Sequence, residues 1–166
     1  GDGGGDSYMS TQFTPIDDGV LVSQNSVAYS MWITTDVSED VYDWGTWGGT
    51  GGASVQSRIR NTGDDTYWRV HGSGISSSGD AVPSSIGFYT YTRRAESEGE
   101  AYRNGVGIDD DTSTSTGEGA NPIYFLAGYN EVNGGTKRFA CFIITSGLND
   151  TEVSNMYDTL NTYKWW

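Results

Sequence analysis

The sequence predicts an all-β fold, a two-sheet antiparallel jelly-roll sandwich of the concanavalin A-like type with one short C-terminal helix. Apolar and polar residues alternate with a period of two along most of the chain, as they do on strands with one buried face. The 166 residues include 24 Gly and only 3 Pro, a composition typical of short strands joined by tight turns. Aromatic residues make up 13% of the chain, which supplies bulk for a core and excludes general disorder.

The clearest predicted strand covers residues 26–35. Its two faces both carry apolar bulk, with Tyr29 and Met31 on one face and Trp32 on the other. This pattern favours an interior strand of a two-layer structure. Further strands are expected at residues 8–13, 20–22, 53–60, 66–71, 86–93, 98–103, 123–129 and 138–145.

Turns and loops separate these strands. The pair Asn104-Gly105 predicts a two-residue hairpin turn, because both residues tolerate the positive φ that a type I′ turn requires. The stretches 36–52 and 109–120 are acidic or polar and rich in Gly, Ser and Thr, so we expect two loops at the rim of the sandwich, facing outward.

One helix is expected near the C-terminus, over residues 149–161. Asn149 is a good N-cap and Glu152 follows three residues later, which is the spacing of a capping box. Leu148 and Val153 occupy the two positions of a hydrophobic staple. The apolar residues that follow Val153 recur at helical spacing.

The predicted organisation is a flexible lead-in over residues 1–7 and a single jelly-roll domain over residues 8–166. The formal net charge of −13 excludes general nucleic-acid binding, because such a surface repels phosphate backbones. No apolar run approaches the ~20 residues of a membrane span, so no membrane insertion is expected. With a single cysteine, Cys141, and a single histidine, His71, neither an internal disulfide nor a zinc cluster is expected. We interpret Cys141 as a buried, inert thiol and His71 as structural.

Three segments together resemble concanavalin A-like and laminin-G-like jelly rolls. They are Ser-Met-Trp-Ile-Thr-Thr at residues 30–35, Ala-Tyr-Arg-Asn-Gly at residues 101–105, and the closing strand and helix over residues 142–157. The order and spacing of the segments fit that family. The acidic, Gly- and Ser-rich texture is similar to bacteriophage tail and virion proteins. The resemblance implies a fold and not one function. Members of the family bind glycans or proteins, form structural heads on fibres, or cleave polysaccharides.

Four residues are candidates for contacting a ligand: Trp44, Trp47, Trp68 and Asp43. Flat aromatic rings stack on the apolar C–H faces of sugars, and a neighbouring carboxylate accepts hydrogen bonds from sugar hydroxyls. The alternative, that these Trp side chains cap the core, is weighed equally.

Two acidic clusters are candidates for binding calcium, which prefers carboxylate and carbonyl oxygens. The first is Asp109, Asp110 and Asp111, and family members often hold such an ion at the loop rim. The second consists of Asp36, Glu39, Asp40 and Asp43. For either cluster, a solvated acidic loop is the preferred alternative.

Glu96, Glu98 and Glu100 alternate on one predicted strand and are the candidates for catalysis. Carboxylates about 6.5 Å apart suit glycoside hydrolysis, and polysaccharide-cleaving members of the family carry a similar acidic motif with Asp at the middle position. Because Glu98 stands at that position here, the motif departs from theirs. A solvated strand paired with Arg93 and Arg94 is the favoured interpretation.

The predicted function is therefore a non-enzymatic, carbohydrate-binding (receptor-binding) module, displayed outside a cell or on a virion, in a phage tail or fibre protein. Its expected partner is a cell-surface glycan or other receptor, with calcium as a candidate cofactor. A homo-oligomer is expected, with a trimer favoured, because linked copies raise avidity at shallow glycan sites. One alternative is a structural virion or filament subunit without a ligand, and a polysaccharide-cleaving glycoside hydrolase or lyase is less favoured.

Overall fold

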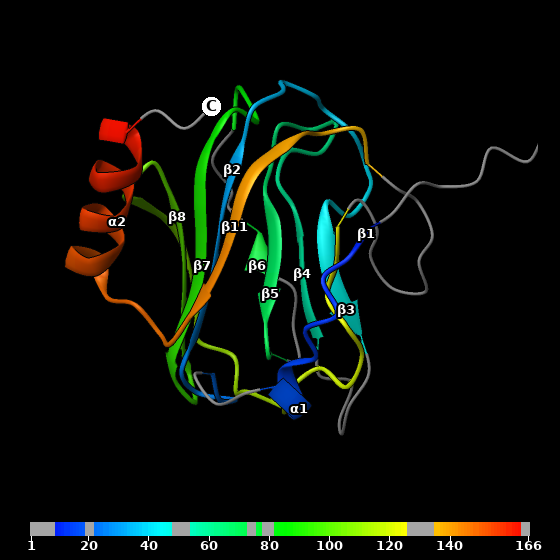
Figure 1. The fold of residues 1–166 in the computed structure, drawn as a ribbon, viewed down its shortest axis with the longest axis vertical. Helices are drawn as coiled ribbons and strands as arrows, with labels where there is room; N and C mark the ends of the chain where they lie inside the picture. The colour runs from blue at the N-terminus through cyan, green and yellow to red at the C-terminus, as the bar shows by residue number, and fades with distance from the viewer. Residues whose placement is uncertain are drawn as a thin grey trace, which may run out of the picture.

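The computed structural model describes residues 9–18, 22–47, 54–72, 76–77, 82–125 and 135–163. Two antiparallel sheets face each other as a sandwich (Figure 1), which confirms the predicted fold class. In spatial order the first sheet consists of β1 (Met9–Ser10), β10 (Tyr124–Phe125), β3 (Trp44–Trp47), β4 (Ser54–Arg58), β5 (Tyr67–Val70) and β6 (Ser76–Ser77). The second sheet consists of β11 (Phe139–Thr145), β2 (Val27–Ile33), β7 (Gly87–Ala95), β8 (Glu98–Arg103) and β9 (Val106–Asp111). The predicted lead-in, 1–7, lies outside the described residues.

Strand β2 is an interior strand, as its sequence predicts. It pairs with β11 on one side and β7 on the other, and all seven of its residues are buried. Alternate residues of β2 point between the sheets, where Tyr29 packs against Trp44 with ring centroids 5.2 Å apart. The other core residues are Val22, Val27, Met31, Ile33, Val55, Ile59, Trp68, Val70, Val82, Tyr89, Tyr91, Ala101, Ile123 and Phe125.

Helix α2 (Asp150–Tyr163) covers part of the outer face of the second sheet (Figure 1). Tyr157 stacks on Trp32 at 5.9 Å between ring centroids. The predicted capping box is confirmed: the Asn149 backbone N–H donates to Glu152 Oε2 at 2.9 Å, and the Glu152 N–H donates to Asn149 Oδ1 at 3.1 Å. The reciprocal bonds satisfy two backbone donors at the helix start. No helix in the described part of the chain has the length and apolar character needed to cross a lipid bilayer.

Two stretches predicted as rim loops contain strands. Within 36–52, residues Trp44–Trp47 form β3, and Gly45 is required there for space, since a Cβ on it would lie 2.6 Å from the Val55 carbonyl oxygen. Within 109–120, the first three residues complete β9. A one-turn helix, α1 (Pro15–Asp18), was not expected.

The hairpin between β8 and β9 turns at Asn104-Gly105, as predicted. Both residues have positive φ, 52° and 79°, which is the requirement of a type I′ turn. Further along the hairpin a bulge shifts the register, so that Tyr102 pairs with Gly107 but Ala101 pairs with Asp109.

A buried guanidinium ties β7 to its surroundings. The Arg93 side chain is fully buried and its Nη2 lies 2.7 Å from Asp111 Oδ2. The remaining donors reach three carbonyl oxygens, those of Val70 at 2.7 Å, Glu96 at 2.8 Å and Ser113 at 3.1 Å. Every Arg93 nitrogen is thereby paired, which is the condition for tolerating a buried charge.

His71 is buried in a polar cage inside the sandwich. Its Nδ1 lies 3.2 Å from the Gln24 carbonyl oxygen, so Nδ1 carries the proton, and Nε2 accepts from the Tyr29 hydroxyl at 3.2 Å. Burial is the main cause that lowers the pKa of His71 from 6.5 to about 4. The side chain is therefore neutral and structural, as expected from its place in the sequence.

This burial predicts a pH-dependent loss of stability. Because the unfolded chain takes up the proton first, the contribution of neutral His71 is complete above pH 6.5 and is lost as the pH falls toward 4. The loss amounts to about 2 kcal/mol between pH 6.5 and 5. Burial of Asp43 raises its pKa to about 6. The folded chain therefore takes up this proton first, and protonation of Asp43 stabilises the fold as the pH falls. Urea unfolding of the native chain and of His71→Asn isolates the histidine: the pH slope between 6.5 and 5 is smaller in the variant, and equal slopes would contradict the prediction.

Candidate functional site

The structure corrects the prediction that Trp44 and Trp68 face a ligand. Both side chains are completely buried. Trp68 stacks on Tyr91 at 5.8 Å, and Trp44 lies 6.0 Å from the same ring. Rings enclosed between two sheets cannot stack on a sugar, so these residues belong to the core.

Asp43 is also buried, which corrects its assignment as a ligand-binding residue. Its Oδ2 accepts from the Ile59 backbone N–H at 2.6 Å, and Lys137 Nζ lies 3.0 Å from its Oδ1. The carboxylate therefore fixes the chain around β4. Trp47 ends β3, but its side chain lies outside the described residues.

The three consecutive aspartates of β9 do not converge on one point, because strand neighbours alternate between faces. Asp109 and Asp111 lie on the inner face, where Asp109 Oδ2 accepts from Trp68 Nε1 at 2.7 Å and Asp111 is held by Arg93. Asp110 is exposed on the outer face. No group of three or more His, Cys, Asp or Glu side chains among the described residues is arranged to hold a metal ion, so the expected calcium site is not found at these residues.

The carboxylates of the second acidic cluster, Asp36, Glu39, Asp40 and Asp43, also contact other groups of the chain. Asp36 accepts from Arg60 Nη1 at 2.8 Å, and Asp40 accepts from the Thr62 hydroxyl at 2.6 Å. Glu39 Oε1 lies 3.2 Å from Lys137 Nζ. These contacts join the segment before β3 to residues 60–62 and to Lys137.

The alternating glutamates share one arginine. Arg94 Nη2 lies 2.7 Å from Glu98 Oε1 and 2.8 Å from Glu100 Oε2. The favoured pairing with Arg94 is therefore confirmed for Glu98 and Glu100. Arg93 points into the core, and its one contact with these glutamates is to the backbone carbonyl oxygen of Glu96. Glu98 and Glu100 converge on a cation, and Glu96 is exposed at the turn.

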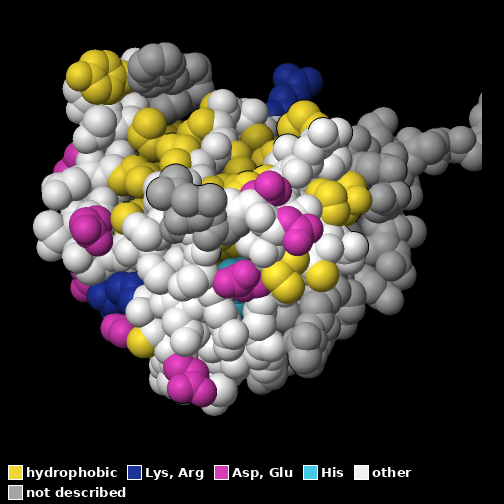
Figure 2. All heavy atoms as spheres, turned by 60° about the horizontal axis from the view of Figure 1, so that its bottom comes forward, with side chains coloured by type: hydrophobic (Ala, Val, Ile, Leu, Met, Phe, Trp, Pro, Cys, Tyr) yellow, Lys and Arg dark blue, Asp and Glu magenta, His cyan; other side chains and the backbone are white. Residues whose placement is uncertain are grey.

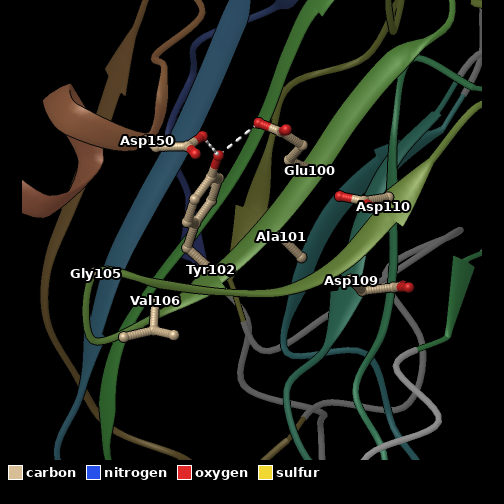
Figure 3. A pocket seen from close by; sticks show the side chains of 9 residues that line it. Glu100, Ala101, Tyr102, Gly105, Val106, Asp109, Asp110 and Asp150 are labelled. Carbon is tan, nitrogen blue, oxygen red and sulfur yellow. Dashed lines mark hydrogen bonds between the residues drawn. The ribbon is translucent and has the colours of Figure 1, made fainter.

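The described residues form a groove of about 350 Å³ beside the β8–β9 hairpin of the second sheet. It lies where β8 and β9 meet the first residue of α2 (Figure 3). Its lining consists of Glu100, Ala101, Tyr102, Gly105, Val106, Gly107, Asp109, Asp110 and Asp150. Val106 is 67% exposed and is an apolar member of this lining.

Tyr102 holds two of the carboxylates. Its hydroxyl oxygen lies 2.5 Å from Glu100 Oε2 and 2.6 Å from Asp150 Oδ1 (Figure 3). Burial, and then the bonds to the two carboxylates, raise the pKa of Tyr102 well above its ordinary value, so the phenol keeps its proton at neutral pH. One proton serves only one of the two oxygens at a time, which leaves an acceptor for a hydroxyl or ammonium group of a ligand.

The charge of the groove restricts what it can bind. Glu100 and Asp110 pair directly across the β8–β9 ladder, and like charges in directly opposed positions are destabilising. Arg94 is the cation that contacts Glu100. The groove therefore suits neutral polyols or cation-bearing ligands and repels anions.

Sequence reasoning missed Tyr102 and Asp150 as members of one site. The sequence indicates Tyr102 only as part of the hairpin segment 101–105, and Asp150 only as part of the helix expected over residues 149–161. The capping box is the one sequence feature that bears on Asp150, because it fixes where α2 begins. The position of α2 beside β8 depends on the packing of Tyr157 against Trp32 and Phe88.

No protein-family model matches the chain, and the search of curated proteins gives no match. Solved structures do share its fold. Domain 4 of AbnA, a GH43 extracellular arabinanase from Geobacillus stearothermophilus solved with arabinotriose, has a TM-score of 0.58 at 14% identity over 84% of this chain and 69% of that chain. Trypanosoma rangeli sialidase has a TM-score of 0.62 at 12% identity over 83% of this chain and 23% of that chain. The botulinum neurotoxin serotype D binding domain has a TM-score of 0.57 at 18% identity over 82% of this chain and 37% of that chain.

These neighbours are an arabinanase domain solved with arabinotriose, a sialidase and a toxin binding domain, and the part of each that matches this chain shares its fold. This chain spans about a quarter to two fifths of the sialidase and toxin chains. At identities this low, the likeness establishes the fold and not the activity.

Proposed function

We propose that this chain is a carbohydrate-binding module that recognises a neutral or amino-bearing glycan in the groove beside Tyr102. The observation that carries the proposal is the arrangement of Glu100 and Asp150 around one phenol. Carboxylates and a tyrosine hydroxyl are the acceptors and the donor that sugar hydroxyls need. The similarity in fold to an arabinanase domain solved with arabinotriose supports the same class of ligand.

The groove would bind a sugar through hydrogen bonds around an apolar contact. Asp110 is exposed and available to accept from sugar hydroxyls. Val106 lies at the same rim, where its methyl groups can meet a C–H face. Binding is favoured over cleavage because Glu98 and Glu100, the closest candidates for an acid–base pair, are both bound to Arg94.

We further propose that the module acts outside the cell or on a virion, as the receptor-binding part of a phage tail or fibre protein. The resemblance of residues 30–35, 101–105 and 142–157 to the concanavalin A-like family supports this setting. So does the high negative charge of the chain, −13, which keeps displayed copies soluble.

A glycan array tests the proposal directly. We expect retention of neutral or amino-bearing oligosaccharides and no retention of sialylated or uronic-acid chains. Against a retained glycan, Glu100→Gln and Asp110→Asn should each weaken binding about tenfold, the effect of losing roughly 1.4 kcal/mol of charge-assisted hydrogen bonding.

Asp158→Asn is the matched control, because it makes the same charge change at an exposed position of α2 that does not line the groove. It should bind as the native chain does, and circular dichroism should show that all three variants are folded. An array without retained glycans, or equal affinities of the native chain and both groove variants, would overturn the proposed site.

A further inference from the structure

The two sheets have four edge strands in the described part of the chain, and these edges differ in length and charge. In the described residues, β1 and β6 are two residues long. β9 ends in three aspartates, of which Asp109 and Asp111 point inward. Very short edges and inward-pointing charges are the features by which proteins keep sheet edges from joining.

The fourth edge strand, β11, is longer and has no inward-pointing charge, and its register against β2 shifts only between Phe139 and Cys141, near its start. Its seven residues, Phe-Ala-Cys-Phe-Ile-Ile-Thr, include no charge and no proline. The strand pairs only with β2 among the described residues, and it runs along the front of the molecule in Figure 1. At about 3.3 Å per residue it presents an edge roughly 23 Å long.

The side chains of β11 are also incompletely covered. Phe142 and Ile144 contact the core but stay half-buried. Cys141 and Ile143 alternate with them on the outer face and are half-buried too, so the thiol is less enclosed than the sequence suggested. Figure 2 shows hydrophobic side chains gathered on this side of the molecule.

We propose that β11 is an interface between two copies of this chain. The two strands pair antiparallel about a two-fold axis and join the five-stranded sheets into one continuous sheet. Such an interface is self-complementary, since each copy supplies the same row of backbone donors and acceptors. The pairing extends both cores by placing the half-buried side chains of one strand against those of the other.

Charge favours a second copy as the occupant of this edge. Copies of a chain with a net charge of −13 repel each other over most of their surface, and β11 is an uncharged stretch. Exposed Arg138 precedes the strand, and exposed Asp150 and Glu152 follow it at the start of α2. Antiparallel pairing brings the basic end of one strand toward the acidic end of the other.

Pairing through β11 gives a dimer and not the trimer that the avidity argument predicts. Pairing uses β11, and within the residues that the structure describes the other edge strands are short or charged. A dimer through β11 leaves the groove beside Tyr102 free, because that groove is lined by β8, β9 and α2.

Sedimentation over a range of concentrations tests the proposal. We expect a species of twice 18.0 kDa for the native chain. Ile143→Lys places a charge in the new interface and should shift the mass to 18.0 kDa. Val106→Lys is the matched control, because it places the same charge on β9, the opposite edge of the same sheet, and should leave the dimer intact.

Cross-linking of the native cysteine gives an answer that does not depend on the folding of a variant. Cys141 is the only cysteine and lies at the middle of β11, so antiparallel pairing brings the two thiols within reach of a short bis-maleimide. Burial raises the pKa of this thiol, so the reaction is run at about pH 8. A covalent dimer on a denaturing gel, absent for Cys141→Ser, is the expected result.

A monomer at every concentration without a covalent dimer would overturn the interface. So would a dimer that Val106→Lys dissociates and Ile143→Lys does not. Either result leaves the glycan proposal unaffected, since sedimentation and cross-linking do not measure glycan binding and β11 does not line the groove.

Discussion

Replacing Arg93 with Met is expected to destabilise the protein by about 3–5 kcal/mol. The substitution leaves the Asp111 carboxylate without its cation in a buried position, and breaking a buried pair by removing one partner typically costs that much. Three carbonyl oxygens, those of Val70, Glu96 and Ser113, lose their donor at the same time. Urea unfolding followed by circular dichroism measures the change in the free energy of unfolding.

Two further variants separate the charge from the packing. Arg93→Met combined with Asp111→Asn removes the stranded charge and should recover part of the loss. Arg60→Met is the matched control, because its partners Asp36 and Asp64 are 43% exposed in their side chains, and pairs of that kind contribute roughly 0–1 kcal/mol. A loss below about 1 kcal/mol for Arg93→Met would show that the guanidinium does not organise this region.

Replacing Trp44 with Ala is expected to cost about 3–5 kcal/mol, the range for removing a large aromatic side chain from a core. The ring packs against Tyr29, Tyr91 and Phe142, with centroids 5.2, 6.0 and 5.4 Å away. A binding platform at the surface would behave differently, because its removal weakens glycan binding with little change in stability. Thermal or urea unfolding together with a binding assay therefore distinguishes the two roles.

Trp44→Phe is the control for that experiment. The indole Nε1 is buried and has no hydrogen-bond partner among the described residues. Removing an unsatisfied donor recovers part of the lost packing energy, so Phe should cost much less than Ala. Equal losses for the two variants would contradict the assignment of Trp44 to an apolar core site.

One feature of the candidate site can be predicted from the sequence and another cannot. The Asn104-Gly105 pair alone predicts the β8–β9 hairpin and its turn, because the backbone conformation there is limited by local sterics. A regular two-residue hairpin would pair Glu100 with Asp109. The bulge at Ile108 moves the pairing by one residue, to Asp110, and so turns Asp109 inward toward Trp68. The side-chain period of a strand is two, so this single shift decides which carboxylate faces the groove.

Features with local energies follow from the sequence alone: the alternation of the long strands, the tight hairpin turn, and the reciprocal capping bonds at the start of α2. Whether an aromatic or charged side chain faces the core or the solvent depends instead on how the two sheets and α2 pack together. The same Trp that suits a sugar platform also suits a core, and the second sheet decides between them by enclosing Trp44 and Trp68. Likewise, Arg93 and Arg94 are adjacent in sequence, yet the pleat of β7 sends one to Asp111 and the other to Glu98 and Glu100. Burial is a property of what packs against a residue, and those partners come from distant parts of the chain.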